Sequence, residues 1–218
     1  MPPFKVAVEN KMASWRLRFS VAEVAAGICE NLDTEIVDEH IVSLYENLIS
    51  DKEPEVKSEA VAKLHELSKH ASPSRLIDKL VPNLNNITVN DVSQHVRGSL
   101  ALSVCDVAKN LGKQHALTYI VPVVVTLLKD QATEVRIILM QHLRTLTEVI
   151  GQDEFDRNII PHLTQLSTDK IWRVKLALIN FMPELAQFLD TALFKDRLES
   201  VIMGLMSDTV FQIREEAT

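Results

Sequence analysis

The sequence repeats itself about every 40 residues. A pair made of an aliphatic residue and a following Arg or Lys recurs at intervals of 39, 40, 39, 39 and 39 residues in this chain of 218. In five of the six occurrences an aspartate stands five residues before the aliphatic member, which we call the marker. A period near 40 is typical of solenoids built from stacked helix pairs. The pairs are Leu17-Arg18, Val56-Lys57, Val96-Arg97, Val135-Arg136, Val174-Lys175 and Ile213-Arg214, and the aspartates are Asp51, Asp91, Asp130, Asp169 and Asp208.

Apolar residues keep a helical spacing within each repeat. Positions 4, 8 and 11 after the marker are apolar in the first five units, as at Leu100, Val104 and Val107. Positions 15, 11 and 8 before the marker are also apolar. The third unit is one residue longer, so its apolar residues, Leu80, Leu84 and Ile87, lie one position further from the marker. Such spacing places the side chains on one face of a helix. Each unit therefore predicts a first helix, a short turn that holds the aspartate, and a second helix.

Glycine and proline punctuate the same pattern. Gly112 and Gly151 are expected to end second helices. Pro82, Pro122 and Pro161 follow Val or Ile, and we expect them to begin or bend the first helix, where a missing N–H costs little. A lone helix pair cannot bury its apolar face, so neighbouring pairs stack around a continuous core. The sequence predicts an all-α protein, an α-solenoid of antiparallel helix pairs in a HEAT- or armadillo-like superhelix.

We interpret residues 1–218 as a single HEAT-repeat array of about five repeats with truncated ends. The short first and last units suggest a window on a longer array. On this interpretation Leu198, Ile202, Leu205 and Ile213 lack a covering repeat, and the chain is expected to self-associate through its open ends. The approximate units are 1–35, 36–74, 75–114, 115–153, 154–192 and 193–218.

Composition and charge limit the cellular compartment and the classes of binding partner that we expect. A net charge of −7 argues against non-specific binding to nucleic acid or to an anionic membrane. Cys29 and Cys105 lie in apolar context without a CxxC pattern, and we expect them to be small buried hydrophobes in a reducing compartment. The N-terminus has no signal-peptide core, and the longest apolar run, 120–128, is too short to span a bilayer. These features favour a soluble, cytoplasmic protein, with the nucleus as a second location.

Catalytic and cofactor-binding patterns are missing from the sequence. It has no glycine-rich phosphate loop, and its seven histidines show no metal-ligand spacing. Paired carboxylates such as Glu215-Glu216 are typical of solvated helix surface. We therefore predict a protein that is not an enzyme, with no cofactor, no metal and no small-molecule substrate.

The recurring aspartates and basic residues allow two interpretations. Each aspartate can cap the start of its second helix and meet a basic residue of an adjacent unit, since stacked helices lie about 10 Å apart. A role for the same charges in binding a ligand also remains open.

The two tryptophans occupy the same place in their repeats. Trp15 and Trp172 stand two residues before the marker, as does Phe211, and Arg16 and Arg173 follow the tryptophans. A position that also tolerates Pro, Gln and Thr is not a core position, so these rings are expected to be partly exposed. Trp and Arg are frequent binding hot spots. The alternative is that each indole packs over a neighbouring turn. The other units hold Pro54, Gln94 and Thr133 here.

Longer stretches carry a family resemblance. DKIWRVKLALINFMPELAQFL (169–189) and SDTVFQIREEAT (207–218) resemble the scaffolding A subunits of type 2A serine/threonine protein phosphatases, in their middle and later-middle repeats. The resemblance extends over essentially the whole chain. It implies a scaffold that joins a phosphatase catalytic subunit to a B-type regulatory subunit. Supporting stretches are SWRLRFSVAEVA (14–25), QHVRGSLA (94–101), EVR (134–136) and EVIG (148–151).

The resemblance also assigns residues to these partners. It implies that Trp172, Arg173 and Phe211 bind the catalytic subunit, with Phe211 in place of a tyrosine, and that Trp15 and Arg16 bind the regulatory subunit. The chain departs from the family where Asn10 replaces the first aspartate and where Ile171 replaces a usual lysine. The alternative is a HEAT-repeat nuclear-transport receptor or another protein-binding adaptor.

Overall fold

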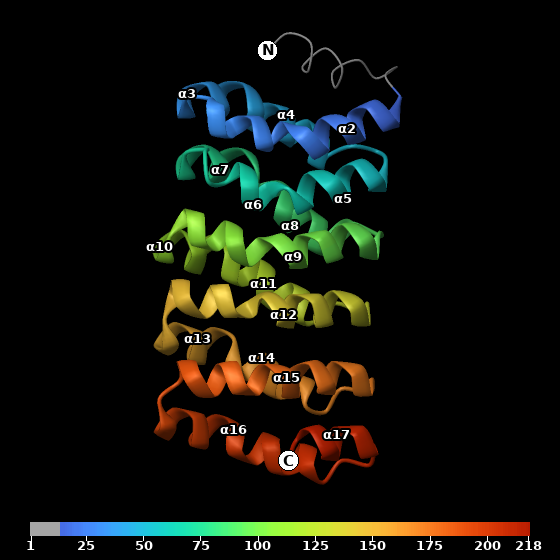
Figure 1. The fold of residues 1–218 in the computed structure, drawn as a ribbon, viewed down its shortest axis with the longest axis vertical. Helices are drawn as coiled ribbons and strands as arrows, with labels where there is room; N and C mark the ends of the chain where they lie inside the picture. Colours follow the sequence, from blue (N-terminus) through green and yellow to red (C-terminus); the bar gives the residue numbers. More distant parts are fainter. Residues whose placement is uncertain (1–13) are drawn as a thin grey trace.

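The computed structural model describes residues 14–218, and these residues form a stack of helix pairs with no strand among them (Figure 1). The first unit contributes α2 (Trp15–Ala25) and the 3-10 turn η1 (Gly27–Asn31). In the second unit the first helix comprises α3 (Thr34–Ile36), the π-helical turn η2 (Val37–Ile41) and α4 (Val42–Ile49), and the second comprises α5 (Pro54–Ala62) and α6 (Leu64–Leu67).

The later units have longer second helices. The third unit has α7 (Pro73–Lys79), α8 (Val81–Asn90) and α9 (Gln94–Leu111). The fourth has α10 (Lys113–His115), the π-helical turn η3 (Ala116–Ile120), α11 (Val121–Leu128) and α12 (Thr133–Ile150). The fifth has α13 (Gln152–Asn158), α14 (Ile160–Leu166) and α15 (Trp172–Phe188), and the sixth has α16 (Thr191–Met206) and α17 (Phe211–Glu216). The predicted all-α solenoid is confirmed.

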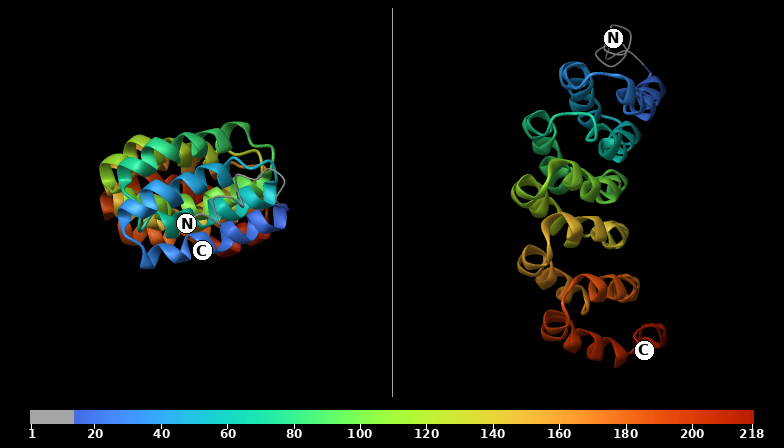
Figure 2. Two further views of the ribbon diagram at one scale, coloured as in Figure 1. Left: turned by 90° about the horizontal axis from the view of Figure 1, so that it is seen from above. Right: turned by 60° about the vertical axis from the view of Figure 1, so that its left-hand side comes forward.

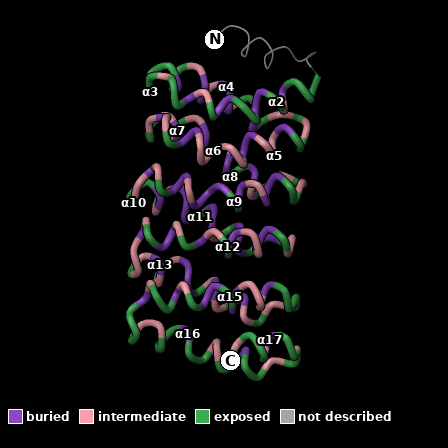
Figure 3. Tube along the Cα trace, in the orientation of Figure 1, coloured by how far each residue is buried: buried purple, intermediate pink, exposed green. Residues whose placement is uncertain are grey.

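The helices form two layers. In the right-hand view of Figure 2 the first helices of the units make one column and the second helices make the other. The stack is curved, and the second helices lie on its concave side. Each helix pair packs on the next pair, so one hydrophobic core runs along the whole stack (Figure 3).

The predicted helical faces point into this core. Every side chain assigned to positions 4, 8 and 11 after a marker is buried except Ile28, which is half-buried. The markers themselves are buried in five units, but Leu17 is 49% exposed. No helix of the described residues lies on the outer side of the first unit to cover Leu17.

One expectation about the last unit is wrong. Leu198, Leu205 and Ile213 are buried, and Ile202 is half-buried, rather than left uncovered. These side chains lie on the faces of α16 and α17 that pack toward α14 and α15, so the preceding unit already covers them. The opposite faces instead expose Met203, Met206 and Phe211.

The proline and glycine signals act where they were expected. Pro82, Pro122 and Pro161 are each the second residue of a helix. Just before them the first helix of the unit breaks at Leu80 and at Ile159, and it takes the π-helical turn η3 ahead of Pro122. Gly112 and Gly151 end α9 and α12 with φ of 79° and 82°, the left-handed region in which a Cβ is unfavourable.

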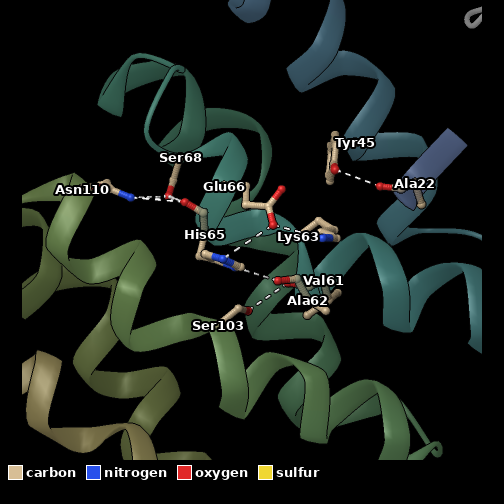
Figure 4. Close-up of polar contacts among 10 residues, drawn as sticks. All are labelled: Ala22, Tyr45, Val61, Ala62, Lys63, His65, Glu66, Ser68, Ser103 and Asn110. Atoms are coloured by element: carbon tan, nitrogen blue, oxygen red, sulfur yellow. Dashed lines mark hydrogen bonds and ion pairs between the residues drawn. The ribbon is translucent and has the colours of Figure 1, made fainter. Parts of the chain in front are cut away.

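The second helices of the first two units are broken, and side chains of other elements bind the carbonyl groups near the breaks (Figure 4). The hydroxyl of Ser103, on α9, donates to the Val61 carbonyl oxygen at 2.9 Å, next to the break at Lys63. The hydroxyl of Tyr45, on α4, donates to the Ala22 carbonyl oxygen at 3.2 Å. Buried backbone acceptors are thus paired, as burial requires.

The glycine at the end of α9 provides a test of these helix boundaries. Gly112→Ala should lower the free energy of unfolding by about 1–2 kcal/mol, because a side chain at positive φ is strained. Gly204→Ala is the control. It lies inside α16 with open space around a new Cβ, so it should raise stability by about 0.5–1 kcal/mol. Urea unfolding of both variants measures this, and equal shifts would contradict the assignment.

Candidate protein-binding surface

Each aspartate of the repeat binds a basic side chain of the preceding unit. Asp130 shows the arrangement: its carboxylate accepts from Arg97 Nε at 2.6 Å, from Arg97 Nη2 at 2.9 Å and from the Ala132 N–H at 2.8 Å. All five aspartates make both kinds of contact. The pairs are Arg18–Asp51, Lys57–Asp91, Arg97–Asp130, Arg136–Asp169 and Lys175–Asp208, and we call them the ladder.

The ladder corrects one part of the sequence interpretation. The aspartates meet basic residues of an adjacent unit, as predicted, but they do not cap the second helices. Asp130 binds the N–H of Ala132, which is itself the residue before α12 begins. The aspartate thus lies two residues ahead of the cap position, too early to reach the N–H groups of the first helical turn. It braces the turn rather than the helix.

Arginine at the basic position also binds its own turn. Arg97 Nη1 donates to the Asp91 carbonyl oxygen at 2.7 Å, and Arg214 Nη1 donates to the Asp208 carbonyl oxygen at 2.7 Å. Arg97 therefore links the turn of its own unit to the turn of the next. The hydrogen bond with Asp130 raises the pKa of Arg97. The ladder charges pair with one another, which supports the structural interpretation over a ligand-binding one.

Breaking a buried pair of the ladder should be costly. Asp130→Ala leaves the Arg97 guanidinium buried without its carboxylate, and we expect a loss of about 3–5 kcal/mol in the free energy of unfolding. Glu134→Ala is the control, because it removes a half-exposed pair with Arg173 and should cost at most about 1 kcal/mol. If urea unfolding gives similar losses for the two variants, the ladder pair contributes no more to stability than a half-exposed surface pair.

The ladder also predicts loss of stability in acid. Burial acts to raise the pKa of Asp51, but hydrogen bonds from Arg18 and the Glu53 N–H outweigh it and hold this pKa below its ordinary value. The pKa of Asp208 is lowered chiefly by the Lys175 ammonium. A lowered carboxyl pKa stabilises the fold fully above the ordinary value of about 3.9, and the contribution is lost as pH falls through the lower, folded-state value.

Melting temperature measured from pH 5 down to pH 2 checks this. The fall should begin below about pH 4 and should be shallower in Asp51→Asn, which has no carboxyl to protonate at that position. Parallel curves for the wild type and the variant would contradict the expectation.

The turns of the ladder lie along one edge of the stack, at the right in Figure 1, which we call the turn ridge. Trp15, Trp172 and Phe211 are the first residues of α2, α15 and α17. Their exposed fractions are 37%, 37% and 64%. The predicted partial exposure is confirmed, while the assignment of these residues to partners stays a prediction.

Two of the predicted residues are neighbours on the turn ridge. Arg173 Nη1 lies 2.8 Å from Glu134 Oε1 of the preceding unit, and both side chains are half-exposed. Trp172 lies beside them and lines a hollow over the preceding helix, α12. The indole keeps an accessible face, and the choice between a binding role and a packing role stays a prediction. Phe211 begins the next second helix, with the Arg214 guanidinium 5.8 Å from its ring centroid.

Trp15 and Arg16 lie at the other end of the stack (Figure 1). The Arg16 guanidinium is 4.7 Å from the Trp15 ring centroid, which is a cation–π geometry. We call Trp15 and Arg16 the first patch, and Trp172, Arg173 and Phe211 the second patch. Asn10, which replaces the first aspartate, lies outside the described residues.

Sequence reasoning missed a hollow between α12 and α15, which we call the inner groove. Its volume is about 370 Å³. Two residues after the marker, the units that form the groove have Ile137 and Leu176, whereas the second and third units have Ser58 and Gly98. The first unit has Phe19 at this position, so the position alone does not identify the groove. The lining residues are Ile137, Met140, Gln141, Trp172, Arg173, Leu176, Ala177, Asn180, Phe181 and Glu184.

Membrane-spanning helices and metal sites have no candidate within residues 14–218. No helix in this range has the length and apolar character needed to cross a bilayer. The same range contains no group of three or more His, Cys, Asp or Glu side chains placed to hold a metal ion. Cys29 and Cys105 are both buried, as predicted, and burial raises the pKa of Cys29 to about 11.

Solved structures share this architecture. Cex1p superposes with a TM-score of 0.77 at 13% identity, over 98% of this chain and 40% of that one. Kap121p bound to Pho4p gives a TM-score of 0.70 at 16% identity, over 99% and 23%. A computationally designed armadillo repeat protein for modular peptide recognition gives 0.59 at 16% identity, over 99% and 96%. These identities show the fold alone, and the chain is an α-solenoid of the armadillo and HEAT class.

Sequence comparison is more specific. Residues 34–112 match the family model described as PPP2R1A-like HEAT repeat, and residues 111–216 match the model described as PIK3R4-like, middle domain. The beta isoform of the human 65 kDa regulatory A subunit of serine/threonine-protein phosphatase 2A is 31% identical over 136 residues. That alignment covers 61% of this chain and 22% of the human protein. The chain is thus similar to the phosphatase 2A scaffolding subunit, and the expected resemblance is confirmed over 61% of the chain rather than over its whole length.

Proposed function

We propose that this chain is a non-catalytic scaffold that joins the catalytic subunit of a protein serine/threonine phosphatase to a B-type regulatory subunit. The observation that carries the proposal is the 31% identity to the human 65 kDa subunit, together with the PPP2R1A-like match of residues 34–112. A solenoid whose ladder charges are paired internally is consistent with a binding role. We propose a cytoplasmic or nuclear location, with no cofactor and no nucleic-acid or membrane partner.

The mechanism of such a scaffold is geometric. The second patch would bind the catalytic subunit, while the first patch would bind the regulatory subunit, at a separation set by the stacked units between them. Both patches combine an exposed aromatic ring with arginine, the residue types that most often carry binding energy. The ladder would hold the turns that carry these rings in register, since it connects each turn to the next.

Substitution at Trp172 separates binding from folding. Trp172→Ala should weaken the affinity for purified phosphatase catalytic subunit by about thirtyfold or more, as expected for a central aromatic hot spot. It should lower the free energy of unfolding by only about 1 kcal/mol, because the ring is partly exposed. Arg173→Glu should also weaken binding, and it loses only a half-exposed pair with Glu134.

Thr133→Ala is the matched control, since Thr133 begins α12 at the same position of the preceding unit. It should change neither affinity nor melting temperature. Biolayer interferometry and thermal melts give the two readouts. If Trp172→Ala unfolds the protein, the indole is a packing element. If the wild type does not bind the catalytic subunit, the scaffold proposal itself fails.

A second candidate is a HEAT-repeat adaptor with other partners. It is favoured by the match of residues 111–216 to a PIK3R4-like middle domain, since that half of the chain contains the second patch. A nuclear-transport receptor is one such adaptor. Binding to a GTP-loaded small GTPase of nuclear transport, together with no binding to the phosphatase catalytic subunit, would favour this candidate.

A further inference from the structure

The inner groove continues into a second hollow. The second hollow is bounded by α12 and α15 further along their length, with a volume of about 230 Å³. Phe181 and Glu184 line both hollows, so the two adjoin each other at these residues. Trp172, at the start of α15, lies at the turn-ridge end of this path. The face of α15 that lines this path adjoins its buried face, since Leu185 and Phe181 line the second hollow and are themselves buried. The second helices that carry the lining residues form the concave layer of the stack (Figure 2).

Glu184 lies where the two hollows adjoin and has no polar partner among residues 14–218. Its Oε2 atom is buried and accepts no hydrogen bond from any residue in the described range. The side chain as a whole is half-buried, and no ion pair within residues 14–218 involves it. A buried carboxylate oxygen without a hydrogen-bond donor is unfavourable for the fold. A donor supplied by a ligand would remove this cost and so contribute to binding.

The other charges along the path are already paired. Arg173 pairs with Glu134 at 2.8 Å, and Arg144 pairs with Glu148 at 3.4 Å. These two pairs cancel, which leaves the single negative charge of Glu184. On the side of the inner groove the walls are mainly apolar, with Leu176 and Phe181 from α15 and with Ile137 and Met140 from α12. The second hollow is more polar and includes Arg144, Thr147, Glu148 and Gln187. The complement of such a surface is one cation between apolar side chains.

We propose that the inner groove binds a segment of a partner protein in which one arginine or lysine is flanked by apolar residues, with its cation on Glu184. The apolar neighbours would lie on Leu176, Ile137 and the inner edge of Trp172. This contact adjoins the turn ridge at Trp172, but it does not depend on which proteins bind the rest of the ridge. A partner that approached over Trp172 could extend into the groove without leaving the surface of α15.

The test uses short synthetic peptides as probes. One fluorescent peptide carries a central arginine between leucines, and its twin carries glutamine in place of arginine. Binding is read by anisotropy and, in the Trp15→Phe background, by the emission of Trp172, which is then the only tryptophan. The arginine peptide should bind at least about tenfold more tightly than its twin, as a charged hydrogen-bonded pair predicts.

Glu184→Gln should abolish that preference while keeping the shape of the groove. It should not lower the melting temperature, because it replaces a buried charge that lacks a partner. Glu55→Gln is the control, since it removes the same charge from the exposed first turn of α5 and should keep the preference.

Several outcomes would overturn the proposal. They are equal affinity for the two peptides, an equal effect of Glu55→Gln, and no binding of the arginine peptide at millimolar concentration. A change of anisotropy without any change in Trp172 emission would place the peptide elsewhere and would overturn it too.

Discussion

The ion pair between a basic residue of one unit and the aspartate of the next unit is the contact on which the architecture depends. Apolar burial drives stacking but is non-directional, and it would tolerate units that slide or rotate against each other. A guanidinium that donates two hydrogen bonds to one carboxylate, as Arg97 does to Asp130, allows little such freedom. Repetition of this contact along the stack sets the spacing and orientation of successive turns.

This use of charge has a consequence for recognition. Because the ladder charges are paired within the chain, the proposed partners would be recognised by other groups. The two surfaces proposed here are the first residues of the second helices and the groove between α12 and α15. Trp15, Trp172 and Phe211 occupy the first location, and the inner groove with Glu184 occupies the second. Each repeat from the second to the sixth therefore contributes the same kind of internal ion pair, while the residues exposed on its turn differ from unit to unit.

Much of the fold was determined by local sequence. The period of about 40 residues, the helical spacing of apolar residues and the glycines at 112 and 151 require only the geometry of one helix pair and its turns. The exposure of Trp172 also followed from sequence, because a position that elsewhere holds Pro54, Gln94 and Thr133 cannot be a core position. The pairing of aspartates with basic residues followed from the constant spacing of the two.

The remaining features depend on contacts between units, which no spacing within a unit specifies. The aspartates brace the turns instead of capping helices, because the chain path places each one two residues ahead of its cap position. The preceding unit covers Leu198, Leu205 and Ile213, whereas Leu17 is exposed and no helix within residues 14–218 covers it. The groove around Glu184 exists only because α12 and α15 lie side by side, so that residues about one repeat apart in the sequence line one space. Sequence alone determined the helices and their buried faces, and the packing of successive units decided which outer faces meet and what they enclose.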